Sequence, residues 1–227
     1  MERREMDSLL ELIALHTERG KVNRDAPYPP DLKGQEGVDE LTARALAEGV
    51  DPNRVLNEGL MTGMSRIGEK FSRHQAFVPD LLMAARAMGA GMAHLKPYFD
   101  SGVTKHKGVF VIGTVQGDLH DIGKNLVAMI MEGGGWEVID LGVDASAEKF
   151  IAAIDAHPGC IVGLSALLTT TMMNMEKIVQ AIKTQRPDTK VIVGGAPLTQ
   201  EFCEKIGADH YSRDPQSALH FLAAAGN

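Results

Sequence analysis

The sequence predicts an α/β protein in which an N-terminal helical bundle precedes a doubly wound parallel sheet of five strands. Three observations lead to this fold class. Apolar residues recur at three-and-four spacing through the first hundred residues, as they do in amphipathic helices. After residue 107 the pattern changes to short apolar runs separated by helical stretches. Only 5% of the 227 residues are aromatic, so the apolar material is mainly aliphatic.

Four helices are predicted before residue 100. In order, they cover 4–18, 38–49, a stretch from Pro52 through Ile67, and a stretch from Pro79 to about Leu95. Three prolines and a glycine within 21–36 predict a loop or an ordered arm. Asp51 before Pro52 predicts an N-cap followed by proline at the first helical position. The helices predict a small bundle, with an N-terminal helix and a proline-containing arm over 1–35 and a helical cap domain over 36–100.

Five apolar runs predict the strands of the sheet. They cover 108–113, 136–142, 160–165, 190–195 and, more weakly, 209–212, and a last helix is expected at 215–225. Strands that alternate with helices predict a flavodoxin-like (Rossmann-type) sheet, in a second domain over 107–227. Ligands of such sheets bind beyond the carboxyl ends of the strands, so the loops after Gly113, Ser165 and Gly195 are candidate ligand sites.

Composition excludes several classes of protein. The formal net charge of −7 argues against general nucleic-acid binding. No apolar run approaches the ~20 residues of a membrane-spanning helix, and the charged N-terminus does not resemble a signal peptide. Cys160 and Cys203 lack the spacing of a disulfide framework or a thiolate zinc site. We therefore expect a cytoplasmic protein with no nucleic-acid partner and no membrane partner.

The loop after the first predicted strand, 113–125, does not match the common nucleotide-binding motifs. It contains no GxGxxG fingerprint. A phosphate-binding loop also fails, because five residues separate Gly117 from Gly123 and Asn125 follows Lys124. What remains is a polar cluster at the mouth of a parallel sheet.

The cluster contains Asp118, His120 and Asp121. A loop histidine can bind a metal through one ring nitrogen, while a carboxylate two residues earlier holds the other N–H and fixes the tautomer. The alternative is that Asp118 or Asp121 caps the following helix and that His120 is merely exposed. One Asp-x-His alone does not separate these interpretations.

Further motifs favour the metal-binding interpretation. Asp118-x-His120-x-x-Gly123 is followed 41 residues later by Ser165-x-Leu167, and after 26 more residues by Gly194-Gly195. This order resembles the cobalamin-binding domain of corrinoid-dependent methyltransferases, whose motifs are DxHxxG, SxL and GG. Residues 60–88 resemble the helical cap that precedes this domain in methionine synthase and in the small corrinoid carriers. The resemblance covers roughly 36–225, and no catalytic barrel fits within this length.

The resemblance implies that cobalamin binds base-off and His-on. His120 would be the lower axial ligand of cobalt, and Asp118 would accept its Nδ1 proton. Thr171 would supply the third group of the relay, where methionine synthase has serine. The cofactor would cycle between methylcobalamin and Co(I), and the His–Asp unit would take up a proton when His120 leaves the cobalt.

The resemblance also implies a wider set of cofactor-binding residues. Those of the α/β domain are Gly117, Asp118, Leu119, His120, Asp121, Ile122, Gly123, Ser165, Leu167, Thr169, Thr170, Gly194, Gly195, Tyr211 and Asp214. For Tyr211 and Asp214 a structural role is equally open. In the cap, Phe71, Val78 and Met64 would shield the upper face. Ordinary core packing explains Phe71 and Val78 equally well, and for Met64 it is the favoured explanation.

The function that the resemblance implies is that of a corrinoid methyl carrier. A substrate-specific methyltransferase would load the methyl group, a second methyltransferase would pass it to an acceptor such as tetrahydrofolate or coenzyme M, and a reductive activase would restore oxidised cobalt. Methylamines, methanol, betaines and aryl methyl ethers remain open as donors. The alternatives are a cobalamin-dependent regulator, the small subunit of an adenosylcobalamin mutase, and a flavodoxin-like nucleotide-binding domain.

Overall fold

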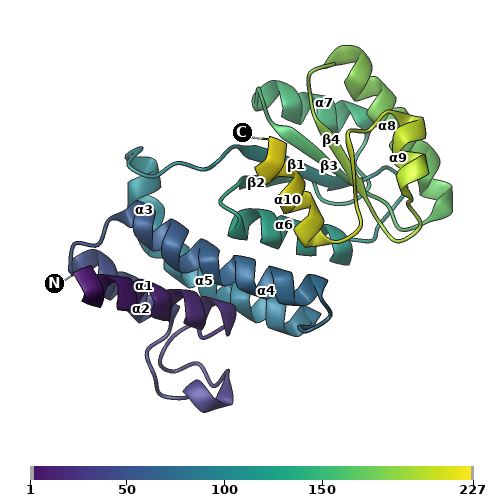
Figure 1. Cartoon of the computed structure of the whole chain (residues 1–227). Coiled ribbons are helices and arrows are strands. Elements are labelled where there is room, and N and C mark those ends of the chain that lie inside the picture. The colour runs from purple at the N-terminus through teal and green to yellow at the C-terminus, as the bar shows by residue number, and fades with distance from the viewer. Residues whose placement is uncertain (1–2, 226–227) are drawn as a thin grey trace. The chain divides into compact units, whose positions relative to one another are not determined.

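The computed structural model describes residues 3–225, which form two compact units (Figure 1). One unit comprises residues 3–105 together with 133–135, and the other comprises 106–132 and 136–225. None of the described helices combines the length and the apolar character needed to span a bilayer.

The first unit is entirely helical. Its elements are α1 (Arg3–Glu18), the 3₁₀ turn η1 (Pro30–Leu32), α2 (Val38–Ala47), α3 (Pro52–Arg54), η2 (Val55–Met61), α4 (Thr62–Ser72) and α5 (Val78–Asp100). The helix predicted from Pro52 is one continuous helical run through α3, η2 and α4, with a π-helical segment at η2. Asp51 caps it as predicted, since its carboxylate accepts the Asn53 N–H at 2.8 Å.

α5 continues past its predicted end near Leu95. Pro97 lies inside the helix and removes one backbone donor, which is why the sequence suggested an earlier end. The helix nevertheless persists to Asp100, and the Ser101 N–H still donates to the Pro97 carbonyl at 3.1 Å. A single missing hydrogen bond near a helix end therefore does not terminate it.

α1 and the arm that follows it belong to the same bundle. Ile13 of α1 is fully buried, and Arg66 of α4 binds Glu11 of α1 through both carboxylate oxygens, at 2.7 and 2.9 Å. Within the arm, the Tyr28 hydroxyl donates to Asp80 at the start of α5, at 3.2 Å. The buried Lys21 ammonium donates to the Ala26 carbonyl at 2.8 Å, so the arm is ordered and packs on the helices.

The second unit is the predicted parallel sheet. Its strands are β1 (Val109–Thr114), β2 (Glu137–Asp140), β3 (Ile161–Ser165), β4 (Val191–Gly194) and β5 (His210–Ser212). Its helices are α6 (Ile122–Gly133), α7 (Ala147–Ala156), α8 (Thr169–Gln185), α9 (Gln200–Ile206) and α10 (Pro215–Ala225). The strand order is β2-β1-β3-β4-β5, and all four pairings are parallel.

Each face of the sheet has its own core. On one face, side chains of α7, α8 and α9, including Phe150, Met175 and Cys203, pack against the sheet. On the other face, Met131 of α6 and Leu222 of α10 pack against it (Figure 1). The predicted fold class is confirmed. Because the strand order reverses between β1 and β3, the loops after these two strands border the crevice where such sheets bind ligands.

Candidate functional site

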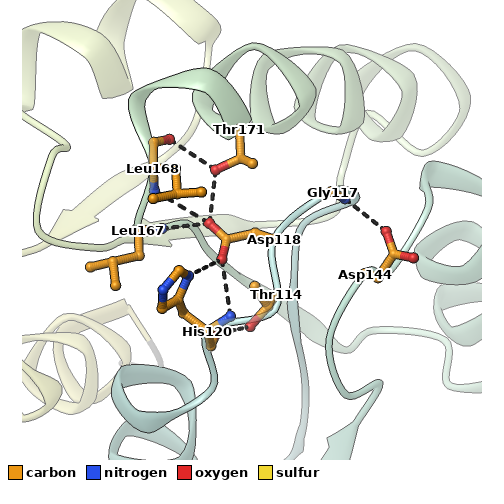
Figure 2. Close-up of polar contacts among 8 residues, drawn as sticks. All are labelled: Thr114, Gly117, Asp118, His120, Asp144, Leu167, Leu168 and Thr171. Carbon is orange, nitrogen blue, oxygen red and sulfur yellow. Dashed lines mark hydrogen bonds and ion pairs between the residues drawn. The ribbon is translucent and has the colours of Figure 1, made fainter.

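The loop from β1 to α6 holds His120 against a buried carboxylate. Asp118 is completely buried, and its Oδ1 lies 2.7 Å from His120 Nδ1 (Figure 2). The same oxygen accepts the backbone N–H of His120 at 3.0 Å. Because an ionised carboxylate only accepts hydrogen bonds, Nδ1 carries the proton and the lone pair lies on Nε2. Within the described part of the chain no hydrogen-bond partner is recorded for Nε2, and the His120 side chain is half exposed.

The second oxygen of Asp118 joins this loop to the start of α8. Oδ2 accepts the backbone N–H groups of Leu167 and Leu168, at 2.8 and 3.4 Å, and the Thr171 hydroxyl at 2.8 Å (Figure 2). The N-cap residue of α8, Leu168, has no capping side chain of its own. Asp118 therefore caps α8 from another loop, and the helix dipole favours its negative charge.

These contacts keep Asp118 ionised. Burial alone would raise the pKa of its carboxyl group. Hydrogen bonds from the backbone of Leu167 and His120, from the His120 ring and from the Thr171 hydroxyl outweigh burial and hold the pKa well below its usual range. The Thr171 hydroxyl also lies 2.8 Å from the Leu168 carbonyl, but its single proton favours the charged acceptor.

Several exposed apolar side chains follow the carboxyl ends of β1 and β3. They are Leu119, Ile122, Leu167, Leu168 and Met173. Leu119, Ile122 and Leu167 were expected at the site, whereas Leu168 and Met173 were not. The signal that could have revealed them is a pair of apolar residues directly after the strand and another in the first turns of α8. Exposed apolar side chains in the same loops and helix as the histidine are consistent with a large, partly apolar ligand.

The motif glycines differ in whether the fold of the chain itself requires glycine at their positions. A Cβ on Gly195, whose φ is 140°, would lie 1.8 Å from the Ala166 carbonyl oxygen, and one on Gly194 would lie 3.2 Å from the Ser212 carbonyl oxygen. The chain itself therefore demands glycine at 195. A Cβ on Gly123 would meet no atom within 4 Å, although Gly123 lies in the first turn of α6. This open space next to the histidine loop can admit a ligand.

The remaining predicted residues have identifiable positions. Thr169 and Thr170 are exposed in the first turn of α8, and Ser165 ends β3. Asp214 accepts the Ser217 N–H at 2.9 Å at the start of α10, which gives it a helix-capping role. Tyr211 is partly buried against the core.

The polar site is built from the second unit alone. Phe71 and Met64 lie in α4 and Val78 begins α5, all in the helical unit. Met64 is buried, and Phe71 and Val78 are half-buried. Burial gives Met64 a packing role in this structure.

The arrangement fits a corrinoid. It offers one imidazole nitrogen as an axial ligand for cobalt, held by an ionised carboxylate that fixes the ring. Exposed apolar side chains after β1 and β3 and open space beside Gly123 suit a large macrocycle with a nucleotide tail. His120 would hold the metal, and Asp118 and Thr171 would support it from behind.

Comparison with known proteins agrees with this interpretation. Residues 108–220 and residues 35–96 each match a family described as "B12 binding domain". The chain is 40% identical over 190 residues to trimethylamine corrinoid protein 1 of Methanosarcina mazei, covering 82% of this chain and 88% of that protein. It is 39% identical over 187 residues to dimethylamine corrinoid protein 3 of Methanosarcina acetivorans, covering 82% of this chain and 87% of the relative.

Solved structures agree as well. A cobalamin-binding protein from Desulfitobacterium hafniense is 28% identical, with a TM-score of 0.72 over 96% of this chain and 97% of that one. The methanol:cobalamin methyltransferase complex MtaBC from Methanosarcina barkeri matches with a TM-score of 0.81 and 28% identity, over 97% of this chain and 80% of that one. With an exposed histidine held by a buried aspartate at the mouth of a B12-binding sheet, this chain belongs to the family of corrinoid proteins.

Proposed function

We propose that this protein is a corrinoid methyl carrier, which binds cobalamin base-off and His-on. The observation that carries the proposal is the contact of 2.7 Å between His120 Nδ1 and the buried Asp118 carboxylate, which leaves Nε2 directed away from its partner as a metal ligand. Bound cobalamin supplies the cobalt ion that accepts a methyl group and releases it again. The protein would hold this ion through His120, whose ring Asp118 keeps in place.

His120 and Asp118 together determine where one proton binds. When Nε2 of His120 has no metal partner, it can accept a proton while Asp118 keeps its negative charge and continues to hold Nδ1–H. The hydrogen bonds to Asp118 hold the pKa of that carboxyl well below its usual range, so Asp118 stays ionised. Thr171 keeps its hydroxyl hydrogen bond to Asp118 in both states.

The relatives support a methyltransferase as one partner. The chain resembles trimethylamine and dimethylamine corrinoid proteins, and a structure that contains a methanol:cobalamin methyltransferase. We infer that a substrate-specific methyltransferase loads this carrier and that a methylamine is the first donor to test. A second methyltransferase would remove the methyl group, and a reductive activase would restore cobalt after accidental oxidation. A regulatory role is not favoured, because these relatives are corrinoid proteins of methyl-transfer systems.

The direct test is reconstitution with hydroxocobalamin, gel filtration and a visible spectrum. The wild-type chain should retain about one equivalent of corrinoid, and His120→Ala should shift the visible spectrum of whatever it retains. Methyl transfer from trimethylamine, dimethylamine or methanol, each with its own methyltransferase, then identifies the donor. A well-folded protein that retains no corrinoid would refute the proposal.

A further inference from the structure

The peptide group that joins Gln116 to Gly117 is held at both ends by side chains. Its N–H, which belongs to Gly117, donates to Asp144 Oδ1 at 2.7 Å (Figure 2). Its carbonyl, which belongs to Gln116, accepts Asn174 Nδ2–H at 2.9 Å. Asp144 comes from the loop between β2 and α7, and Asn174 comes from α8. Two separate elements therefore fix the plane of one peptide group.

This peptide lies immediately before the turn that carries Asp118 and His120. Gly117 has a φ of 84°, in the left-handed region that glycine adopts readily and leaves readily. The next residue is Asp118, which holds the ring of His120. A change in the backbone dihedral angles of Gly117 would turn the Asp118 backbone and carry its carboxylate with it. Fixing this peptide at both ends therefore fixes the direction of the histidine.

Asp144 is bound to the same turn a second time. Its own backbone N–H donates to the Asp118 carbonyl at 3.0 Å, and its φ of 51° places it in the left-handed region. Among residues other than glycine, aspartate and asparagine tolerate this conformation best. A side chain that both accepts a hydrogen bond and tolerates positive φ is therefore favoured here.

The position of this contact points to a role in the site. Asp144 and Gly117 are exposed, and neither belongs to the cores on the two faces of the sheet. An exposed hydrogen bond contributes little to global stability. Its main consequence is the orientation of the turn that presents His120.

We propose that Asp144 and Asn174 are positioning residues, which clamp the Gln116–Gly117 peptide and so hold Asp118 and His120 ready to bind cobalt. The inference rests on the proposed binding of cobalamin through His120. It adds two residues that do not touch His120 and that lie outside the DxHxxG, SxL and GG motifs.

The test compares Asp144→Ala, Asn174→Ala and the double variant with the wild-type chain. In the cofactor-free protein, amide hydrogen exchange at Gly117 should speed up in both single variants, although only Asp144 touches that N–H. Affinity for hydroxocobalamin should fall about three- to tenfold in each single variant. The fold-loss of affinity in the double variant should be smaller than the product of the two single-variant losses. The visible spectrum should shift toward that of His120→Ala.

Two further variants separate positioning from folding. Asp144→Asn keeps an oxygen acceptor and tolerates positive φ, so it should restore affinity and spectrum. Asp144→Gly relieves the backbone but removes the acceptor, so it should not. Asp155→Ala removes another exposed carboxylate of the same unit, which binds Arg186 at 2.7 Å, and should leave binding unchanged.

The inference is wrong if Asp144→Ala and Asn174→Ala bind hydroxocobalamin with wild-type affinity and spectrum, or if Asp144→Asn fails to restore them. Thermal unfolding of each variant shows whether loss of fold explains the result. Failure of the proposed function is distinguishable, because the wild-type chain itself would then retain no corrinoid. The exchange rate at Gly117 reports on the clamp even in that case.

Discussion

Replacing Gly123 with alanine should make the cofactor-free chain more stable and bind cobalamin less tightly. Gly123 lies in the first turn of α6, it is exposed, and an added Cβ would meet no atom within 4 Å. Alanine is favoured over glycine in a helix by about 0.8–1 kcal/mol, and we expect roughly half of this at a first turn. The free energy of unfolding should therefore rise by about 0.5 kcal/mol, and Tm by roughly 1–2 °C.

The same methyl group should obstruct a bound corrinoid. Adding a methyl group to a well-packed contact costs about 1–3 kcal/mol, which corresponds to a loss of affinity of roughly 5- to 150-fold. Thermal unfolding of the cofactor-free protein and equilibrium titration with hydroxocobalamin measure the two effects. Gly89→Ala is the matched control, because Gly89 is also helical, exposed and free of contacts within 4 Å of an added Cβ. Because Gly89 lies in the helix interior, this change should stabilise the chain by about 0.8–1 kcal/mol, and it should leave binding unchanged.

Two results would contradict this reasoning. If Gly123→Ala binds hydroxocobalamin as tightly as the wild-type chain, the open space beside α6 is not part of the binding site. If the variant is less stable without cofactor, the chain itself requires glycine at this position. Either result would separate Gly123 from the proposed role of the DxHxxG motif.

Three further changes have expected outcomes. Asp118→Asn should weaken the dependence of the free energy of unfolding on pH below about pH 4. The folded-state pKa of Asp118 is depressed, so its ionised carboxylate stabilises the fold above about pH 4 and this stabilisation is lost as pH falls. The loss in the wild-type chain is at most about 1.4 kcal/mol per pH unit. Urea unfolding of the cofactor-free protein between pH 5 and pH 2 measures this, and equal slopes for both proteins would contradict it. Thr171→Val removes one donor to buried Asp118 and should cost about 1–2 kcal/mol, whereas Thr171→Ser keeps the donor and should cost less in the same urea assay. Tyr28→Phe removes the hydroxyl bound to Asp80 and should cost at most about 1 kcal/mol in urea unfolding, while a larger loss would mean that this contact anchors the whole arm.

The fold could be predicted because buried parallel strands are short apolar runs. The runs at 108–113 and 160–165 correspond to β1 and β3 within one residue at each end. The arm was harder to place, because prolines indicate irregular backbone without indicating the surface that it contacts. The contact from Tyr28 to Asp80 joins residues 52 positions apart, and no local pattern reveals it.

The candidate site could also be predicted only in part. The sequence motifs identified Asp118 and His120, and the resemblance added Thr171, which the structure brings to 2.8 Å from Asp118. The capping of α8 by Asp118 was not predicted, because its partners act through backbone N–H groups that any residue supplies. Asp144 and Asn174 were missed for a related reason, since both bind a peptide group rather than a side chain.

The capping of α8 by Asp118 also governs how the site opens. The amide protons of His120, Leu167 and Leu168 all terminate on one carboxylate, although they belong to loops after two different strands. If one loop moves away and breaks its hydrogen bond, the Asp118 carboxylate that accepts the other hydrogen bonds is disturbed as well. The two loops should therefore fluctuate as a single cooperative unit, so that the histidine is either fully presented or lost together with the first turn of α8.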